Sequence, residues 1–236
     1  IRTNWLSSQG KYVSELEERF SDVCGGSALT VSNGTSALHL ALLALEIKPG
    51  DEVIVPDITF AATANAVLHA GGIPVFVDVS PVNWGINPEL IEDAITSKTK
   101  AILPVHLYGH PCDMDPILDI ARRYDLKVIE DCAEALGASY KGKPVGEIGD
   151  AGCFSFFGNK IITTGEGGMV VFKNIDAYDR AKVIRDHGMS PGKKYWHEVV
   201  GYNYRLTNIQ AAIGLGQMEQ FDEIVKKRGS LSKIYN

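Results

Sequence analysis

The sequence predicts an α/β fold with a mostly parallel sheet that helices cover on both faces. Short apolar runs rich in Val, Ile and Phe alternate with segments of helical periodicity through most of the 236 residues. The chain is 45% hydrophobic and 22% charged, a composition that excludes disorder, collagen and low complexity. Its length allows one large α/β domain or two small ones, either with a real core.

The individual elements follow from this alternation. The predicted strands are 52–55, 73–79, 101–107, 127–129, 152–157 and 169–172. The predicted helices are 14–23, 35–45, 59–69, 88–95, 115–124, 175–186 and 207–223. The last of these begins at a threonine that can cap it and carries an apolar stripe. The polar stretch 190–200 predicts a loop.

Charge and cysteine usage exclude several function classes. The chain has 29 acidic and 23 basic residues and no long run of either sign, which argues against a general nucleic-acid or membrane-binding surface. Its longest near-apolar stretch, 37–45, is too short to span a bilayer, and the first residues lack the apolar core of a signal peptide. The four cysteines have no CxxC spacing, so we expect buried reduced thiols and a cytoplasmic protein.

Open parallel sheets bind ligands at the carboxyl ends of their strands, so the polar residues found there are the candidates for function. The segment 32–36, with Gly34 and Thr35, precedes an Ala/Leu-rich helix. It suits a phosphate held by the first helical amides, and equally an ordinary helix cap. Asp131 ends a short β-type run, where a carboxylate faces the ligand crevice. It suits a magnesium ligand, a cap or a partner for a cofactor nitrogen.

A lysine and an aromatic residue complete the set of candidate functional residues. Lys160 follows the aromatic run 154–157 and a Gly-Asn pair. A lysine against aromatic walls is partly desolvated, which lowers the pKa of its amine and frees it as a nucleophile. A single lysine near a turn more commonly faces solvent. Phe60, directly after a predicted strand, suits either a stacking ring or plain core.

Taken together, these residues suit pyridoxal 5′-phosphate. That cofactor needs a lysine to bond its aldehyde, an anion site, a carboxylate for its pyridine nitrogen and a surface on which its ring can stack. Lys160, the 32–36 segment, Asp131 and Phe60 supply one candidate for each requirement.

The chain resembles the DegT/StrS family of sugar-nucleotide aminotransferases, which have the aspartate-aminotransferase-like fold (fold type I) with a seven-stranded type of sheet. The matching strings occur in family order over nearly the whole chain: SNGTSAL at 32–38, PDITFAATAN at 56–65, PVHLYG at 104–109, EDCAEA at 130–135, SFFGNK at 155–160, GEGG at 165–168 and GYNYR at 201–205. The sequence of residues 155–168 is most similar to that of the family branch that makes perosamine-type 4-amino sugars on GDP.

The resemblance implies a role for each matching position. Lys160 would bond the cofactor aldehyde and shuttle the reaction's proton, and Asp131 would pair with the pyridinium. Phe60 would stack on the ring. Gly34, Thr35 and Ser155 would hold the phosphate.

Two further positions have roles near the cofactor by the same resemblance. Glu134 lies near the cofactor, with a less defined role. Asn203 would reach the phosphate in the neighbouring subunit, which implies a homodimer with shared active sites.

The resemblance also implies a reaction and a domain assignment. Glutamate would donate its amino group to a nucleotide-linked 4-keto-6-deoxy sugar, giving a 4-amino sugar. Residues 1–236 would form the pyridoxal-phosphate-binding large domain, with the family's smaller C-terminal domain not included.

Rival interpretations remain open at this point. A non-catalytic paralogue would keep Lys160 by descent, whereas a related sugar dehydratase has histidine at that position. Residues 137–144 have the spacing of a nucleotide-binding P-loop until Pro144, and we interpret them as a hairpin turn. A metal site drawn from the polar residues of 106–113 fits no common zinc spacing, so we expect no metal. His187 is predicted to be a helix-end residue rather than a catalyst.

Overall fold

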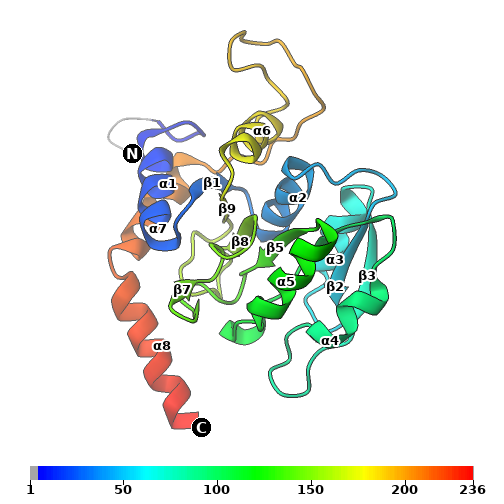
Figure 1. The fold of residues 1–236 in the computed structure, drawn as a ribbon. Helices are drawn as coiled ribbons and strands as arrows, with labels where there is room; N and C mark the ends of the chain where they lie inside the picture. The colour runs from blue at the N-terminus through cyan, green and yellow to red at the C-terminus, as the bar shows by residue number, and fades with distance from the viewer. Residues whose placement is uncertain (1–4, 236) are drawn as a thin grey trace.

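The computed structural model describes residues 5–235 and contains a seven-stranded sheet (Figure 1). In spatial order its strands are β1 (Ser27–Val31), β9 (Gly168–Phe172), β8 (Ala151–Ser155), β5 (Lys127–Asp131), β4 (Thr99–Ile102), β2 (Glu52–Pro56) and β3 (Ile73–Val77). Strand β9 pairs antiparallel with both β1 and β8, and the pairs from β8 to β3 are parallel. The predicted mostly parallel sheet is confirmed.

Eight α-helices are found in the described part of the chain. They are α1 (Lys11–Cys24), α2 (Gly34–Ala44), α3 (Ala62–His69), α4 (Pro88–Ile91), α5 (Met114–Tyr124), α6 (Ile175–Arg185), α7 (Asn208–Met218) and α8 (Phe221–Tyr235). Helix α8 extends away from the body of the molecule in Figure 1. In this part of the chain, no helix combines the length and the apolar character that crossing a membrane requires.

The helices form layers on both faces of the sheet. Helices α2, α3 and α6 share one core with one set of strand side chains, for example Val53 and Ile129. On the opposite face α1 and α7 pack over the β1, β9 and β8 part of the sheet. Helices α4 and α5 cover the rest of this second face. They pack against Ile54 and Val128, which directly follow Val53 and precede Ile129 in the sequence. Alternate residues of a strand thus enter different cores, as the two-residue repeat of a strand requires.

Several predicted boundaries are wrong. The predicted strand 101–107 ends at Ile102, and a 3-10 turn occupies Leu107–Gly109. The predicted helix 59–69 begins only at Ala62, and 88–95 divides into α4 and a 3-10 turn at Glu92–Ala94. The predicted helix 207–223 is two helices, because α7 ends at Met218 and α8 begins at Phe221. Both residues join the same core, so the apolar spacing hides the break.

Strand β1 was not predicted, because its sequence SALTV is short and contains polar residues. Thr30 within it is fully buried, and its hydroxyl donates to Glu17 Oε1 at 2.8 Å. By contrast, the hairpin predicted at 137–144 is confirmed by the short antiparallel strands β6 (Ser139–Tyr140) and β7 (Lys143–Pro144). The predicted loop 190–200 is also confirmed, and it projects at the top of Figure 1.

Candidate active site

A cavity of about 390 Å³ lies at the carboxyl edge of the parallel strands, next to the N-terminus of α2. Except for Asn203, every residue that the sequence singled out for the site contributes to its wall: Gly34, Thr35, Phe60, Asp131, Glu134, Ser155 and Lys160. The strands β2, β5 and β8 end here, so residues far apart in the sequence meet at one place. This is the position that an open α/β sheet offers to a ligand.

Asp131, the last residue of β5, is buried and held in one orientation. Thr63 Oγ1 donates to its Oδ2 at 2.9 Å, and the Ala133 amide donates to its Oδ1 at 3.1 Å. Burial raises the pKa of Asp131, and these hydrogen bonds act against that shift because they stabilise the ionised form. The result is a fixed buried carboxylate that lines the cavity.

Lys160 reaches the same cavity from the turn that follows β8. The turn is closed by the Lys160 amide, which donates to the Phe157 carbonyl at 3.0 Å. The side chain of Lys160 is 21% exposed, and its Nζ lies 3.8 Å from Glu134 Oε1. The other oxygen of Glu134 accepts a 2.8 Å hydrogen bond from the Tyr108 amide. Glu134 therefore links the lysine to the turn after β4.

The anion end of the cavity is built from the first turn of α2 and the end of β8. Asn33 caps the helix by accepting from the Ser36 amide at 2.8 Å. The preceding amides of Gly34 and Thr35 have no acceptor within the helix, as in any first turn. A Cβ on Gly34 would lie 2.8 Å from the Cβ of Ser155, so only glycine allows this close approach. Amides and a hydroxyl beside a helix N-terminus suit a phosphate.

Phe60 and Asn203 occupy different surroundings. The Phe60 side chain is 77% exposed and lines the cavity, so the plain-core alternative for it is wrong. Asn203 lies outside this cavity, exposed in the segment after the 190–200 loop. Its Oδ1 accepts from Arg205 Nε at 3.1 Å, and Arg205 is also paired with Asp186 at 2.6 Å.

The residues present fit pyridoxal phosphate. One wall offers the buried carboxylate Asp131 and another the amine of Lys160. The Gly34–Ser155 cradle would be filled by any larger residue at position 34. An exposed aromatic ring, Phe60, completes the wall. A lysine, a carboxylate, an anion cradle and a ring are the four features that this cofactor needs.

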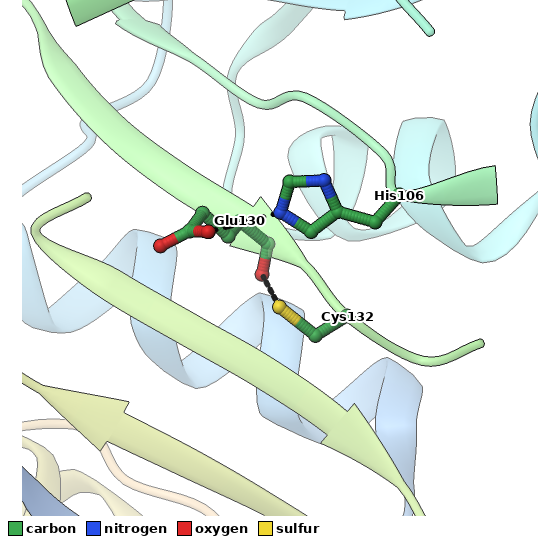
Figure 2. A group of neighbouring side chains, drawn as sticks. All are labelled: His106, Glu130 and Cys132. Carbon is green, nitrogen blue, oxygen red and sulfur yellow. Dashed lines mark hydrogen bonds and ion pairs between the residues drawn. The ribbon is translucent and has the colours of Figure 1, made fainter. Parts of the chain in front are cut away.

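A second polar cluster lies behind Asp131, where His106, Glu130 and Cys132 come within 4.8 Å of one another (Figure 2). His106 Nε2 is 2.9 Å from Glu130 Oε2, and the amides of Gly146, Ile148 and Gly149 donate to the same carboxylate. Both carboxylate oxygens of Glu130 are thus already occupied. Burial raises the pKa of the Cys132 thiol well above its usual value, which opposes the thiolate form that binds metals. We interpret the cluster as a structural network.

Sequence reasoning missed Thr63 and Glu130. Thr63 lies inside the PDITFAATAN string, but only the fold shows that it faces Asp131. Glu130 adjoins Asp131, and its partners are 16 to 24 residues away in the sequence. The alternative metal set drawn from 106–113 is not assembled, since His106 pairs with Glu130 instead. His187 lies outside the cavity, near Arg205.

Comparisons with known proteins identify relatives of this chain. The GDP-perosamine synthase of Caulobacter vibrioides is 54% identical over 227 residues, which cover 96% of this chain and 61% of that protein. A UDP-N-acetyl-3-dehydro-α-D-glucosamine 3-aminotransferase of Acidithiobacillus ferrooxidans is 49% identical over 209 residues, covering 88% of this chain and 56% of that protein. The chain therefore spans about three fifths of the length of these relatives.

The crystal structure of NtdA from Bacillus subtilis, with bound cofactor PMP, superposes with a TM-score of 0.88 at 38% identity. It covers 93% of this chain and 50% of that one. The X-ray structure of the aminotransferase from Psychrobacter cryohalolentis superposes with a TM-score of 0.89 at 41% identity, covering 94% of this chain and 60% of that one, which confirms the expected aminotransferase fold. A family model described as the DegT/DnrJ/EryC1/StrS aminotransferase family matches residues 1–236, and the chain belongs to that family.

Proposed function

We propose that this protein is a pyridoxal-phosphate-dependent aminotransferase that transfers the amino group of glutamate to a nucleotide-linked keto sugar. The observation that carries the proposal is the convergence of Lys160 and Asp131 on one cavity that ends in a phosphate cradle. A lysine and a carboxylate from different strand ends, with an anion site between strand β8 and helix α2, are the requirements of this chemistry.

The cofactor, when bound, supplies an aldehyde that captures amines and a ring that withdraws electrons from the neighbouring carbon. In this proposal Asp131 keeps the ring nitrogen protonated, because Thr63 and the Ala133 amide favour its ionised form. Lys160 Nζ would hold the cofactor and, once free of it, would act as the general base that accepts a proton and returns it. Glu134, 3.8 Å from Lys160 Nζ, orients that amine. This division of roles is general acid–base catalysis by one lysine.

The remaining residues bind and orient. The Gly34 and Thr35 amides and the Ser155 hydroxyl would hold the phosphate, and Phe60, which lines the same cavity, would offer its ring for stacking. Asn203 would contact the phosphate bound by a neighbouring copy in a homodimer, and its exposed position outside its own cavity is compatible with such a contact. Residues 1–236 constitute the large domain of the enzyme. The four cysteines are buried free thiols, which supports a reducing compartment, the cytoplasm.

For the substrate, we propose a 4-keto-6-deoxy sugar on GDP with a 4-amino product. The 54% identity to a GDP-perosamine synthase supports this choice. The relative named as a 3-aminotransferase of a UDP sugar, at 49% identity, supports a 3-keto sugar as the second candidate.

The test is a two-stage spectroscopic titration of the purified protein. We expect a visible absorption band that glutamate removes and that a GDP-4-keto-6-deoxy sugar restores. Restoration only by a 3-keto UDP sugar would select the second candidate. A band that glutamate leaves unchanged would identify a non-catalytic cofactor-binding protein instead.

A further inference from the structure

A second cavity adjoins the cofactor cavity, and the proposed function assigns it no role. Its volume is about 580 Å³, and it shares Glu134, Asn159 and Lys160 with the cofactor cavity. Helix α8 forms its opposite wall through Arg228 and Ser232. A molecule in this cavity would therefore approach the amine of Lys160 from outside the space that the cofactor occupies.

Tyr108 contributes an aromatic ring to this second cavity in an unusual backbone conformation. Its φ of 52° and ψ of 26° place it in the left-handed region, which disfavours bulky residues. The Glu134 carboxylate that lies beside Lys160 accepts the Tyr108 amide at 2.8 Å. The side chain is 83% exposed, so this conformation does not serve core packing. Strained residues of this kind concentrate at ligand sites.

The charge of the wall favours an anionic ligand. Lys160 and Arg228 are its basic side chains and Glu134 its acidic one. Among the described residues Arg228 has no ion-pair partner, whereas the adjacent Lys227 is paired with Glu223 at 2.6 Å. Glu134 is already engaged by Lys160 and Tyr108. The guanidinium is thus available to an anion, and its planar set of donors suits phosphate and carboxylate alike.

We propose that this second cavity is the substrate subsite, in which Arg228 binds an anionic group of the incoming substrate and the Tyr108 ring packs against its neutral part. The inference rests on the proposed function, since the substrate must meet Lys160. Both proposed substrates carry the required charge, as a diphosphate in the sugar nucleotide and as carboxylates in the amino donor. The shared chemistry is an anion attached to a polar carbon skeleton.

Calorimetric titration tests this without turnover, using GDP as the diphosphate probe and glutarate as the dicarboxylate probe. We expect Arg228→Gln to weaken binding of one probe about tenfold, the loss typical of one charge-assisted hydrogen bond, and Arg228→Lys to recover part of it. Tyr108→Asn, which keeps a residue tolerant of the left-handed conformation, should weaken the same probe. Lys226→Gln, on the same helix but outside the cavity wall, is the matched control and should change neither.

The outcomes separate the two anion sources and the two proposals. Weaker GDP binding assigns the cavity to the nucleotide, and weaker glutarate binding assigns it to the amino donor. If Arg228→Gln leaves both affinities within twofold of the unsubstituted protein, or if neither probe binds that protein, the subsite is wrong. Failure of the proposed function itself would be detected separately in the spectroscopic titration, as a visible band that is missing or that glutamate does not change.

Discussion

The hydroxyl of Thr63 donates a 2.9 Å hydrogen bond to Oδ2 of Asp131 and so joins the first turn of α3 to the end of β5. Thr63 is fully buried, and its Oγ1 also lies 2.8 Å from that of Thr59. The bond therefore stabilises the ionised form of a carboxylate whose pKa burial raises. The proposed cofactor chemistry needs Asp131 to be ionised, and this ionisation thus depends on Thr63, which is distant in the sequence but adjacent in the fold.

Replacing Thr63 by valine should shift the pH dependence of cofactor binding. Valine keeps the shape but removes the donor, so the pKa of Asp131 rises further above its usual value. Because the ionised carboxylate binds the cofactor, the acid limb of the affinity profile should move to higher pH, with little change well above it. Titration of the visible band from acid to neutral pH measures this. An acid limb at the same pH in both proteins would contradict it.

Replacing Gly34 by alanine should weaken phosphate binding. The added Cβ would lie 2.8 Å from the Ser155 Cβ, so the first turn of α2 must move away from β8. We expect the cofactor dissociation constant to rise at least about tenfold, equivalent to roughly 1.4 kcal/mol. The control is Gly216→Ala in α7, where nothing lies within 4 Å of the new methyl group. Equal affinity of the two variants for the cofactor would rule out the proposed cradle.

Replacing Glu130 by alanine should destabilise the protein strongly. The carboxylate is fully buried, and His106 and three backbone amides would lose their partner. A loss of about 3–5 kcal/mol is expected for such a buried network. Urea unfolding measures it, with the exposed Glu198→Ala as control. Stability equal to that control, or a large gain in stability on adding zinc, would contradict the structural interpretation of the cluster.

Asn203 allows a complementation test of the proposed shared sites. Lys160→Ala and Asn203→Ala should each be inactive as homodimers. In a two-fold symmetric mixed dimer, one site would combine an intact Lys160 with an intact Asn203. Refolding the variants together in equal amounts should restore roughly a quarter of the activity, since half the dimers are mixed and each has one intact site. A mixture as inactive as its components would contradict the proposed shared sites.

Much of the site follows from the sequence because strand ends are recognisable. Asp131 ends a short apolar run, and Lys160 follows an aromatic one. The rule that parallel strands end at one edge then brings them together. The anion end of the cavity could be predicted for a similar reason, since a Gly-containing cap before an apolar helix is a local sequence pattern.

Features that depend on distant partners were not predictable in this way. Thr63 lies 68 residues before Asp131, and nothing in its own neighbourhood indicates a buried acceptor. The pairing of β1 with β9 joins Ser27–Val31 to the distant segment Gly168–Phe172, and the polar Thr30 weakens the strand signal. The break between α7 and α8 preserves the apolar spacing, so only the structure reveals it.

Borohydride reduction followed by peptide mapping tests the central claim most directly. The reduced protein should lose its visible band and carry the mass of the reduced cofactor on the peptide that contains Lys160. Lys160→Arg, which keeps the charge, should carry no such mass. Attachment at any other lysine, or a protein that takes up pyridoxal phosphate without becoming reducible to a covalent adduct, would contradict the assignment.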